Sequence, residues 1–275
     1  MLFRGYIDES YNAKDQKLFA LSCLIATGKD WFAFERSWKL HLDAVNNKLK
    51  REGRPRICRY HASDCSGRRK EFKGWTHEER DVFVLGLFGI FKRIPVHVVA
   101  FDVNLDELCE VFPEWAGDRL KTAYSILTRF VMHTIGEDFD KLSEGKARLH
   151  GDKITLFHDR TGSDGKYDPV ILQAFNSEMA DRDFPHKNYF TSITSLGWED
   201  CIALQPADLI AFEMFKEAEA KIGARTRRRS FDALYNMEAF GIHKRSFRKE
   251  AMQNLRTYIE EREGGPSVDA LVNSP

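Results

Sequence analysis

The stretch Leu2-Phe3-Arg4-Gly5-Tyr6-Ile7-Asp8-Glu9-Ser10 decides how we expect this chain of 275 residues to fold. An apolar run stops abruptly at two carboxylates, so the acids fall where a buried strand would leave its sheet. Side chains of a strand alternate between two faces, so Asp8 and Glu9 point in opposite directions and one of them can face inward. The simpler interpretation is that Asp8 caps a tight turn into Ser10.

The composition is that of a globular protein with room for one large domain or two small ones. Hydrophobic residues make up 43% and charged residues 31%, and Lys plus Arg equals Asp plus Glu at 42 each. The net charge therefore gives no argument for nucleic acid, and only local patches could. The five scattered cysteines suggest reduced thiols in a cytoplasmic protein. We expect neither a signal peptide nor membrane insertion, because no apolar run approaches about 18 residues.

Strand and helix patterns follow one another along the chain, which indicates an α/β fold. After the first strand, apolar and β-branched runs predict strands at residues 17–27, 96–101, 153–159 and 189–196. Apolar spacings of three and four predict helices at residues 30–51, 76–93, 119–138, 168–181 and 201–221. Residues 66–73 and 139–152 are polar, and we expect surface loops there. We expect residues 1–222 to form the main domain, 223–263 a basic helical extension packed on or beside it, and 264–275 a disordered tail.

Acids recur where strands are expected to end. The runs at 96–101 and 153–159 are followed or closed by Asp102 and Asp159, as the first run is by Asp8. In an open α/β sheet, sites usually lie at the carboxyl ends of strands. The expected helix at 201–221 is apolar almost all round, so Asp208 should be partly buried and should require a donor, a proton or a cation.

Convergence of Asp8, Asp159 and Asp208 would call for positive charge. Each pair about 4 Å apart would repel by roughly 4 kcal/mol at an effective dielectric constant near 20. A shared proton or one or two divalent cations would relieve this, and oxygen ligands without imidazole suit Mg²⁺ or Mn²⁺. Such a site predicts metal-assisted phosphodiester hydrolysis. Other acids near the ends of elements could join or replace members: Glu9, Asp102, Glu199 and Asp200.

A short polar segment offers a different set of reactive groups. Cys58, His61 and Cys65 can be read as three metal ligands, although a structural zinc site needs four and no second pair stands at a finger-like spacing. His61 alone could donate a hydrogen bond to a phosphate, or serve as a structural hydrogen-bonding residue. The basic run from residue 225 is either a solvated surface or a footprint for a phosphate backbone, and it includes Arg227, Arg228 and Arg229.

Four motifs recur together in a known family. They are Tyr6-Ile7-Asp8-Glu9-Ser10, Tyr60-His61-Ala62-Ser63, Phe157-His158-Asp159-Arg160-Thr161-Gly162 and the helix with Gln205-Pro206-Ala207-Asp208-Leu209. With them the chain resembles, over residues 3–220, the family catalogued as domain of unknown function 3800, which is placed in the ribonuclease H-like fold. Where that family usually has Gly after Asp-Glu-Ser, this chain has Tyr11.

The resemblance implies a ribonuclease H-like mixed sheet of about five to six strands flanked by helices. It also implies acids on the first strand, a neighbouring strand and a late helix. Asp8, Asp159 and Asp208 would then bind Mg²⁺ or Mn²⁺, with Glu9 as a further catalytic acid. Contacts to the substrate, or orientation of the ligands, would come from His61, Gln205, Arg160, Arg227, Arg228 and Arg229.

Three functions are compatible with this sequence. The first is a metal-dependent nuclease acting on RNA or DNA. The second is an inactive ribonuclease H-like module that binds nucleic acid or has a regulatory role, for example in a bacterial defence system. The third is a structural or partner-binding domain in which the acids cap elements and pair with Arg or Lys. No pattern indicates an oligomeric state.

Overall fold

A single sheet organises the molecule. The computed structural model describes residues 1–113, 117–143, 151–161, 164–198, 201–223, 225–235, 242–247, 249–250, 252–254 and 256–257. Within these residues a sheet of six strands runs in the order β5-β4-β1-β2-β3-β6. The strands are β1 (Leu2–Tyr11), β2 (Leu18–Thr27), β3 (His97–Asn104), β4 (Lys153–Asp159), β5 (Phe190–Leu196) and β6 (Ile242–Phe247).

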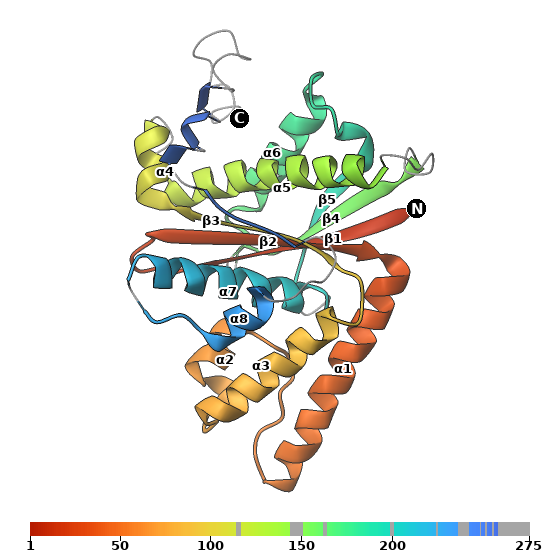
Figure 1. Ribbon diagram of the computed structural model, residues 1–275, viewed down its shortest axis with the longest axis vertical. Helices are drawn as coiled ribbons and strands as arrows, with labels where there is room; N and C mark the ends of the chain where they lie inside the picture. The colour runs from red at the N-terminus through yellow and green to blue at the C-terminus, as the bar shows by residue number, and fades with distance from the viewer. Residues whose placement is uncertain are drawn as a thin grey trace.

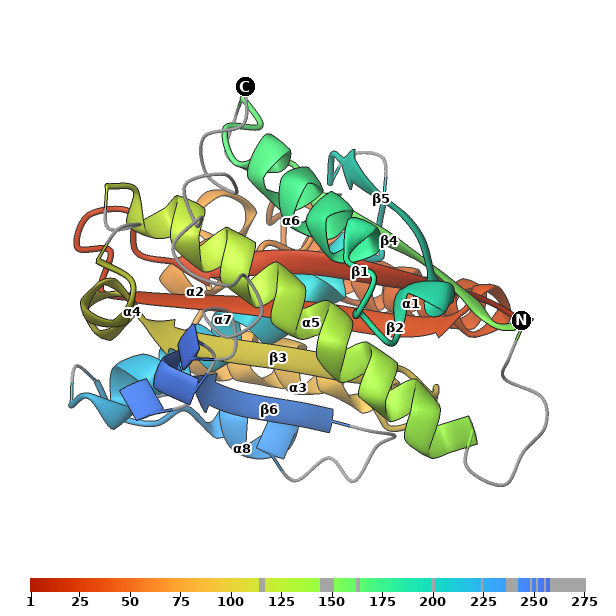
Figure 2. The same ribbon diagram turned by 90° about the horizontal axis from the view of Figure 1, so that it is seen from above.

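The sheet is mixed. Strand β2 pairs antiparallel with both β1 and β3, whereas β1 with β4, β4 with β5, and β3 with β6 are parallel pairs. Five strands therefore share one direction, and their carboxyl ends lie along one edge of the sheet. Figure 2 shows β6 as the outermost strand beside β3.

Helices cover both faces of the sheet. Figure 1 shows α4, α5 and α6 on one side and α1, α2, α3, α7 and α8 on the other. Their bounds are α1 (Gly28–Arg51), α2 (Ala62–Gly67), α3 (His77–Phe91), α4 (Leu105–Val111), α5 (Arg119–Ser143), α6 (Asp168–Ala180), α7 (Leu204–Lys221) and α8 (Arg229–Tyr235). The predicted α/β class, with a mixed sheet between helices, is confirmed.

Alternation along β1 assigns its side chains to two separate cores. Tyr6 packs against Trp31 and Phe157 in the core beneath α7, with ring centroids 4.8 and 5.3 Å away. Ile7 belongs to the core beneath α5. The next two residues repeat this alternation, so Asp8 faces the α7 side and Glu9 faces the α5 side.

Local signals set several boundaries where the sequence predicted them. Thr76 and Glu79 form the expected capping box at the start of α3, with side chains and backbone N–H groups bonded reciprocally. Pro206 lies in the first turn of α7, where its missing N–H costs no helical hydrogen bond. Strand β4 ends at Asp159, as expected.

Four expectations about local structure were wrong. Strand β1 neither ends nor turns at Asp8 but continues, paired with β2, to Tyr11. Strand β3 continues to Asn104, so Asp102 lies within it, buried, and accepts a hydrogen bond of 2.9 Å from Ser246 Oγ. Residues 66–73 are no plain loop, because they contain the end of α2 and a 3-10 turn that buries Phe72. Helix α5 runs on to Ser143, and Asp152 is a buried partner of the amino terminus.

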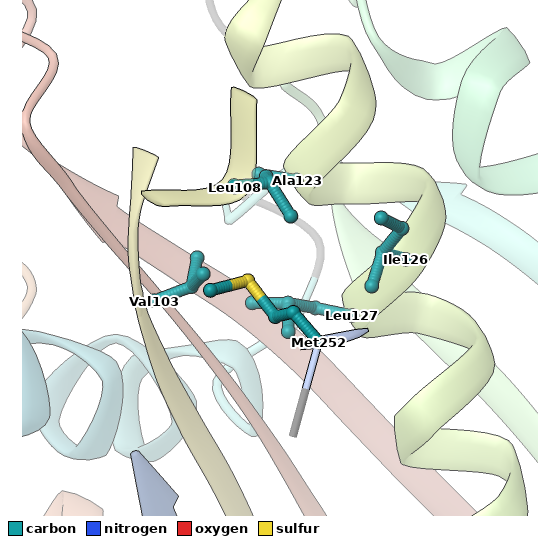
Figure 3. Close-up of a pocket in the computed structure, with 6 residues that line it drawn as sticks. All are labelled: Val103, Leu108, Ala123, Ile126, Leu127 and Met252. Atoms are coloured by element: carbon teal, nitrogen blue, oxygen red, sulfur yellow. The ribbon is translucent and has the colours of Figure 1, made fainter. Parts of the chain in front are cut away.

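The C-terminal extension is not helical throughout. After α8, strand β6 joins the sheet beside β3. Met252 then inserts into an apolar hollow on the α5 side of the sheet, lined by Val103, Leu108, Ala123, Ile126 and Leu127 (Figure 3). The extension therefore completes both the sheet and one core, while residues 264–275 lie outside the described residues. No helix among the described residues is long and apolar enough to cross a membrane.

Candidate active site at the strand ends

Asp8 and Asp159 occupy equivalent positions on neighbouring strands. Ile7 is the register partner of His158, so the next residues along the two parallel strands are Asp8 and Asp159. Both follow the stacked pair Tyr6 and Phe157 by two residues and therefore face α7. Each carboxylate accepts the N–H of the following residue, at 2.8 Å for Asp8 and 2.9 Å for Asp159. One oxygen of each is thus fixed by the backbone of its own strand, at the last residue of β4 for Asp159 and three residues before the end of β1 for Asp8.

Asp208 approaches the same face from α7. Its carboxylate accepts the backbone N–H of Ala62 at 2.7 Å. The preceding residue, Ala207, accepts a hydrogen bond of 2.8 Å from Ser22 Oγ, and Ser22 is the register partner of Asp8 on β2. The first turns of α7 are therefore fastened beside the strand that carries Asp8.

A pinned segment, residues 57–62, lies across the start of α7. The Asn46 side chain bonds both the N–H and the carbonyl of Ile57, at 2.8 and 3.0 Å. Gln205 Oε1 accepts from Tyr60 N at 2.9 Å and from Trp38 Nε1 at 3.0 Å. Gln205 is buried and so orients this segment, and the structure does not place it for contact with a substrate.

Burial and mutual repulsion shift the pKa values of the acids. The pKa of Asp8 lies well above its usual range because of burial and the negative charges of Glu9, Asp208 and Asp159. Burial also raises the pKa of Asp208, although His61, the Ala62 N–H and Arg59 oppose the effect. Within the described chain, no salt bridge reaches Asp8, Glu9 or Asp208. Their charge is left without a cationic side chain bound to it.

Glu9 lies on the other side of β1, next to Tyr124 of α5. Burial raises the pKa of Glu9 to about 7; the Tyr124 hydroxyl lowers it in part, and Asp159 and Asp208 raise it. Tyr124 is fully buried, and its hydroxyl makes no hydrogen bond of ordinary geometry to the described residues.

His61 stands at the start of α2 with its ring half-exposed. Its Nδ1 lies 2.7 Å from Asp64 Oδ2, and its charge acts on Asp208. Cys58 is exposed and Cys65 is buried, which raises the pKa of Cys65 to about 12. Among the described residues, no group of three or more His, Cys, Asp or Glu side chains is arranged to hold a metal ion. That excludes a ready-made site at Cys58, His61 and Cys65, and it also means that the acids do not form a closed cage.

Arg228 is engaged inside the protein. Its guanidinium pairs with Glu213 at 3.0 Å and donates to Ser66 and Ser230, at 2.8 and 3.1 Å. Glu213 is completely buried, so it needs this counter-charge. The expectation that Arg228 contacts a substrate is therefore corrected: it neutralises an acid of α7.

The other predicted arginines also lie apart from the acids or in ion pairs. Arg227 lies 3.1 Å from Asp232 and 3.5 Å from Glu217. Arg229 and Arg160 are exposed. Only Arg160 adjoins the carboxylates, since it follows Asp159 directly and donates its backbone N–H to it. The sequence cluster at 227–229 is thus largely a set of partners for acids of α7 and α8.

Two residues that the sequence reasoning missed stand next to the acids. The Arg59 guanidinium lies 3.6 Å above the ring of Trp198, and the charge of Arg59 lowers the pKa of Asp208. Arg59 belongs to the pinned segment, and Trp198 follows β5. An aromatic residue just beyond a predicted strand end was an available signal. Glu199 and Asp200, which were expected to be able to join the acids, lie outside the described residues.

Comparison with known proteins adds no family to this picture. No protein-family model matches the chain, and a search of curated proteins finds no relative. The resemblance to the domain of unknown function 3800 family stays a prediction that rests on the four motifs.

Proposed function

We propose that Asp8, Asp159 and Asp208 bind Mg²⁺ or Mn²⁺ and that the protein hydrolyses phosphodiester bonds of RNA or DNA on a ribonuclease H-like fold. The observation that carries this proposal is the strand register, which places Asp8 and Asp159 side by side on the face that α7 covers with Asp208. Ribonuclease H-like enzymes carry acids on a first strand, a neighbouring strand and a late helix. In this proposal β1, β4 and α7 would correspond to those elements.

The donor chemistry fits a hard divalent cation, although the spacing is not that of a finished cage. The groups offered are carboxylate oxygens, which Mg²⁺ and Mn²⁺ prefer. Asp8 is buried among like charges without a described salt bridge, so positive charge would lower its energy. Repulsion between the carboxylates favours separated side chains, and neutralisation would allow them to approach.

Most of the site residues have a definite task in this proposal. The bound ions supply Lewis-acid stabilisation of phosphoryl oxygens and a water of lowered pKa. The backbone N–H groups of Glu9 and Arg160 fix one oxygen of Asp8 and of Asp159. His61, whose Nδ1 lies 2.7 Å from Asp64 Oδ2, would contact a phosphate through its other ring nitrogen. Glu9 faces the α5 side of the sheet, beside Tyr124, and is therefore given no step in this proposal.

A cleavage assay tests the proposal. Labelled single-stranded and double-stranded RNA and DNA are incubated with pure protein in Mn²⁺, Mg²⁺ or EDTA. We expect cleavage that requires the metal and falls at least about a hundredfold in Asp8→Asn and Asp208→Asn. Asp43→Asn, at an exposed position of α1, is the matched control and should retain activity. Cleavage that survives both site substitutions would show that another component is responsible.

The second candidate is a module that binds nucleic acid without cutting it. It is favoured by the lack, among the described residues, of any group of three side chains arranged for one metal ion. This candidate predicts binding that weakens with salt and does not depend on divalent ions.

A further inference from the structure

The Arg59–Trp198 pair forms a planar, cationic surface that the proposed catalytic groups do not use. The guanidinium carbon lies 3.6 Å from the ring centroid, a close cation–π contact. Arg59 is half-buried and its segment is fastened at Ile57, Tyr60 and Ala62, so the pair is held in place. Trp198 nevertheless remains 38% exposed. The guanidinium covers one face of the indole, and a second planar group can stack on the part of the indole that remains exposed.

The pair lies at the same edge of the sheet as the carboxylates. Leu196 is the register partner of Asp159, and Trp198 follows it by two residues. Arg59 acts electrostatically on Asp208. A base stacked on Trp198 would therefore lie beside the acids that the proposed reaction uses.

Positive charge continues from this pair along the start of α2. Asp64 is a buried carboxylate with two cationic neighbours, Lys70 at 2.8 Å and Arg69 at 3.4 Å, and its Oδ2 also lies 2.7 Å from His61 Nδ1. The Lys70 and Arg69 side chains are each 62% exposed. One acid cannot neutralise these groups, so a basic lip, formed by His61, Arg69 and Lys70, faces solvent.

Two residues of this segment have an uncommon backbone conformation. Arg68 and Lys70 have φ values of +51° and +48°, in the left-handed region that side chains with a Cβ disfavour. Two such residues flank Arg69 and turn the chain around Asp64. The basic lip therefore depends on a defined backbone conformation of residues 68–70.

We propose that the Arg59–Trp198 pair and the basic lip bind single-stranded nucleic acid, with a base stacked on Trp198 and phosphates paired with Arg69 and Lys70. The inference rests on the proposed function and names its substrate class. Stacking on an aromatic side chain needs a base whose face is free, and bases within a duplex already stack on one another. Lys and Arg at the lip supply the contacts to the backbone, which depend on salt.

Fluorescence anisotropy tests this inference with the full chain. The probes are labelled single strands of RNA and DNA of about twelve nucleotides and duplexes of the same sequence, with Ca²⁺ in place of Mg²⁺. Trp198→Ala should weaken binding of the single strand by about 5- to 150-fold and leave the duplex unchanged, whereas Trp198→Phe should keep most of the affinity. Phe32→Ala removes another exposed aromatic side chain, on α1, and should have no effect.

The charge contacts have their own readout. Lys70→Ala should reduce the slope of log affinity against log salt by about 1, while Arg36→Ala, exposed on α1, should leave it unchanged. Thermal melting of each variant separates loss of fold from loss of contact. If Trp198→Ala binds single strands like the wild type, or if the wild type binds no oligonucleotide, the inference is wrong.

The inference and the proposed function can fail independently. Cleavage that requires Asp8, together with unchanged affinity of Trp198→Ala, would retain the nuclease and remove the binding surface. Binding that depends on Trp198 without any cleavage would retain the surface and remove the nuclease.

Discussion

Ser22 Oγ donates a buried hydrogen bond of 2.8 Å to the carbonyl of Ala207, which joins the strand beside Asp8 to the helix that carries Asp208. Ser22 is the register partner of Asp8, and Ala207 precedes Asp208. This contact thus helps to fix the relative position of two carboxylates that are far apart in the sequence. The Ala62 N–H holds Asp208 from the other side.

Ser22→Ala should loosen this junction. The lost hydrogen bond is expected to cost about 0.5–1.5 kcal/mol of unfolding free energy, because Ser22 is fully buried. Urea unfolding measures the change. Ser192→Ala, at an exposed position of β5, is the control and should stay within about 0.5 kcal/mol. Equal stability of the two variants would contradict a fastening role for Ser22.

Glu9 and Asp8 should each make the metal-free protein less stable as the pH rises from 4.5 to about 7. Glu9 has a usual pKa of 4.5 and a pKa of about 7 in the folded protein, and that of Asp8 is also raised. Between these values the folded state binds more protons than the unfolded state, so the free energy of unfolding decreases with pH. Thermal melting in EDTA across this range is the measurement, and Glu9→Gln should flatten the profile.

Three other acids affect the stability of the protein at lower pH. Burial opposes ionisation of Asp64, Asp168 and Glu178, but their partners prevail and lower each pKa below its usual value. The stability that they contribute is present above the unfolded pKa values and is lost as the pH falls through the lowered ones. His41, His158 and His186 have lowered pKa values and act in the same pH range as Glu9 with the opposite sign. The decisive comparison is therefore between the wild type and Glu9→Gln, and identical melting profiles of these two proteins would contradict a charge-strained Glu9.

Arg228 and Arg229 should differ sharply although they are neighbours in the sequence. Arg228→Ala leaves Glu213 buried without its counter-charge and should cost about 3–5 kcal/mol of unfolding free energy. Arg229→Ala, at an exposed position, should cost less than about 0.5 kcal/mol. Chemical denaturation compares them, and Glu213→Gln in the Arg228→Ala background should restore part of the loss. Two folded variants with equally weakened binding of nucleic acid would instead support the phosphate footprint.

Gln205→Ala should destabilise the protein and release the pinned segment. It removes the acceptor for two buried donors, Trp38 Nε1 and Tyr60 N, and should cost about 2–4 kcal/mol. Amide hydrogen exchange at Tyr60 should become faster. Gln253→Ala is the exposed control. Unchanged exchange at Tyr60 would mean that the segment is held by other contacts.

The sequence predicted the elements better than their contacts. The start of α3 and the end of β4 followed from Thr76, Glu79 and Asp159, which are local signals. Asp102 was misplaced because Val103 extends the β-branched run beyond it. Local patterns thus locate an element but mark its end less well when β-branched residues continue past an acid.

Local sequence patterns could not predict contacts between residues that lie far apart in the sequence. Arg228 was expected at a surface because its partner Glu213 lies on another helix and shows no signal in the sequence. The contact between Arg59 and Trp198 also depends on how the pinned segment and the end of β5 meet in three dimensions. Asp8 and Asp159 were expected together because both were predicted to lie at strand ends. The register does make them neighbours, although β1 continues beyond Asp8 to Tyr11.

Calorimetric titration of Mg²⁺ or Mn²⁺ into the wild type, Asp8→Asn, Asp208→Asn and the control Asp43→Asn tests the central claim most directly. We predict saturable binding and a higher melting temperature with metal in the wild type and Asp43→Asn, and loss of both in the two site variants. Because the acids repel one another, Asp8→Asn should also melt at a higher temperature than the wild type at pH 8 without metal. Absence of binding in the wild type, or equal binding in all four proteins, would contradict a metal site at Asp8 and Asp208.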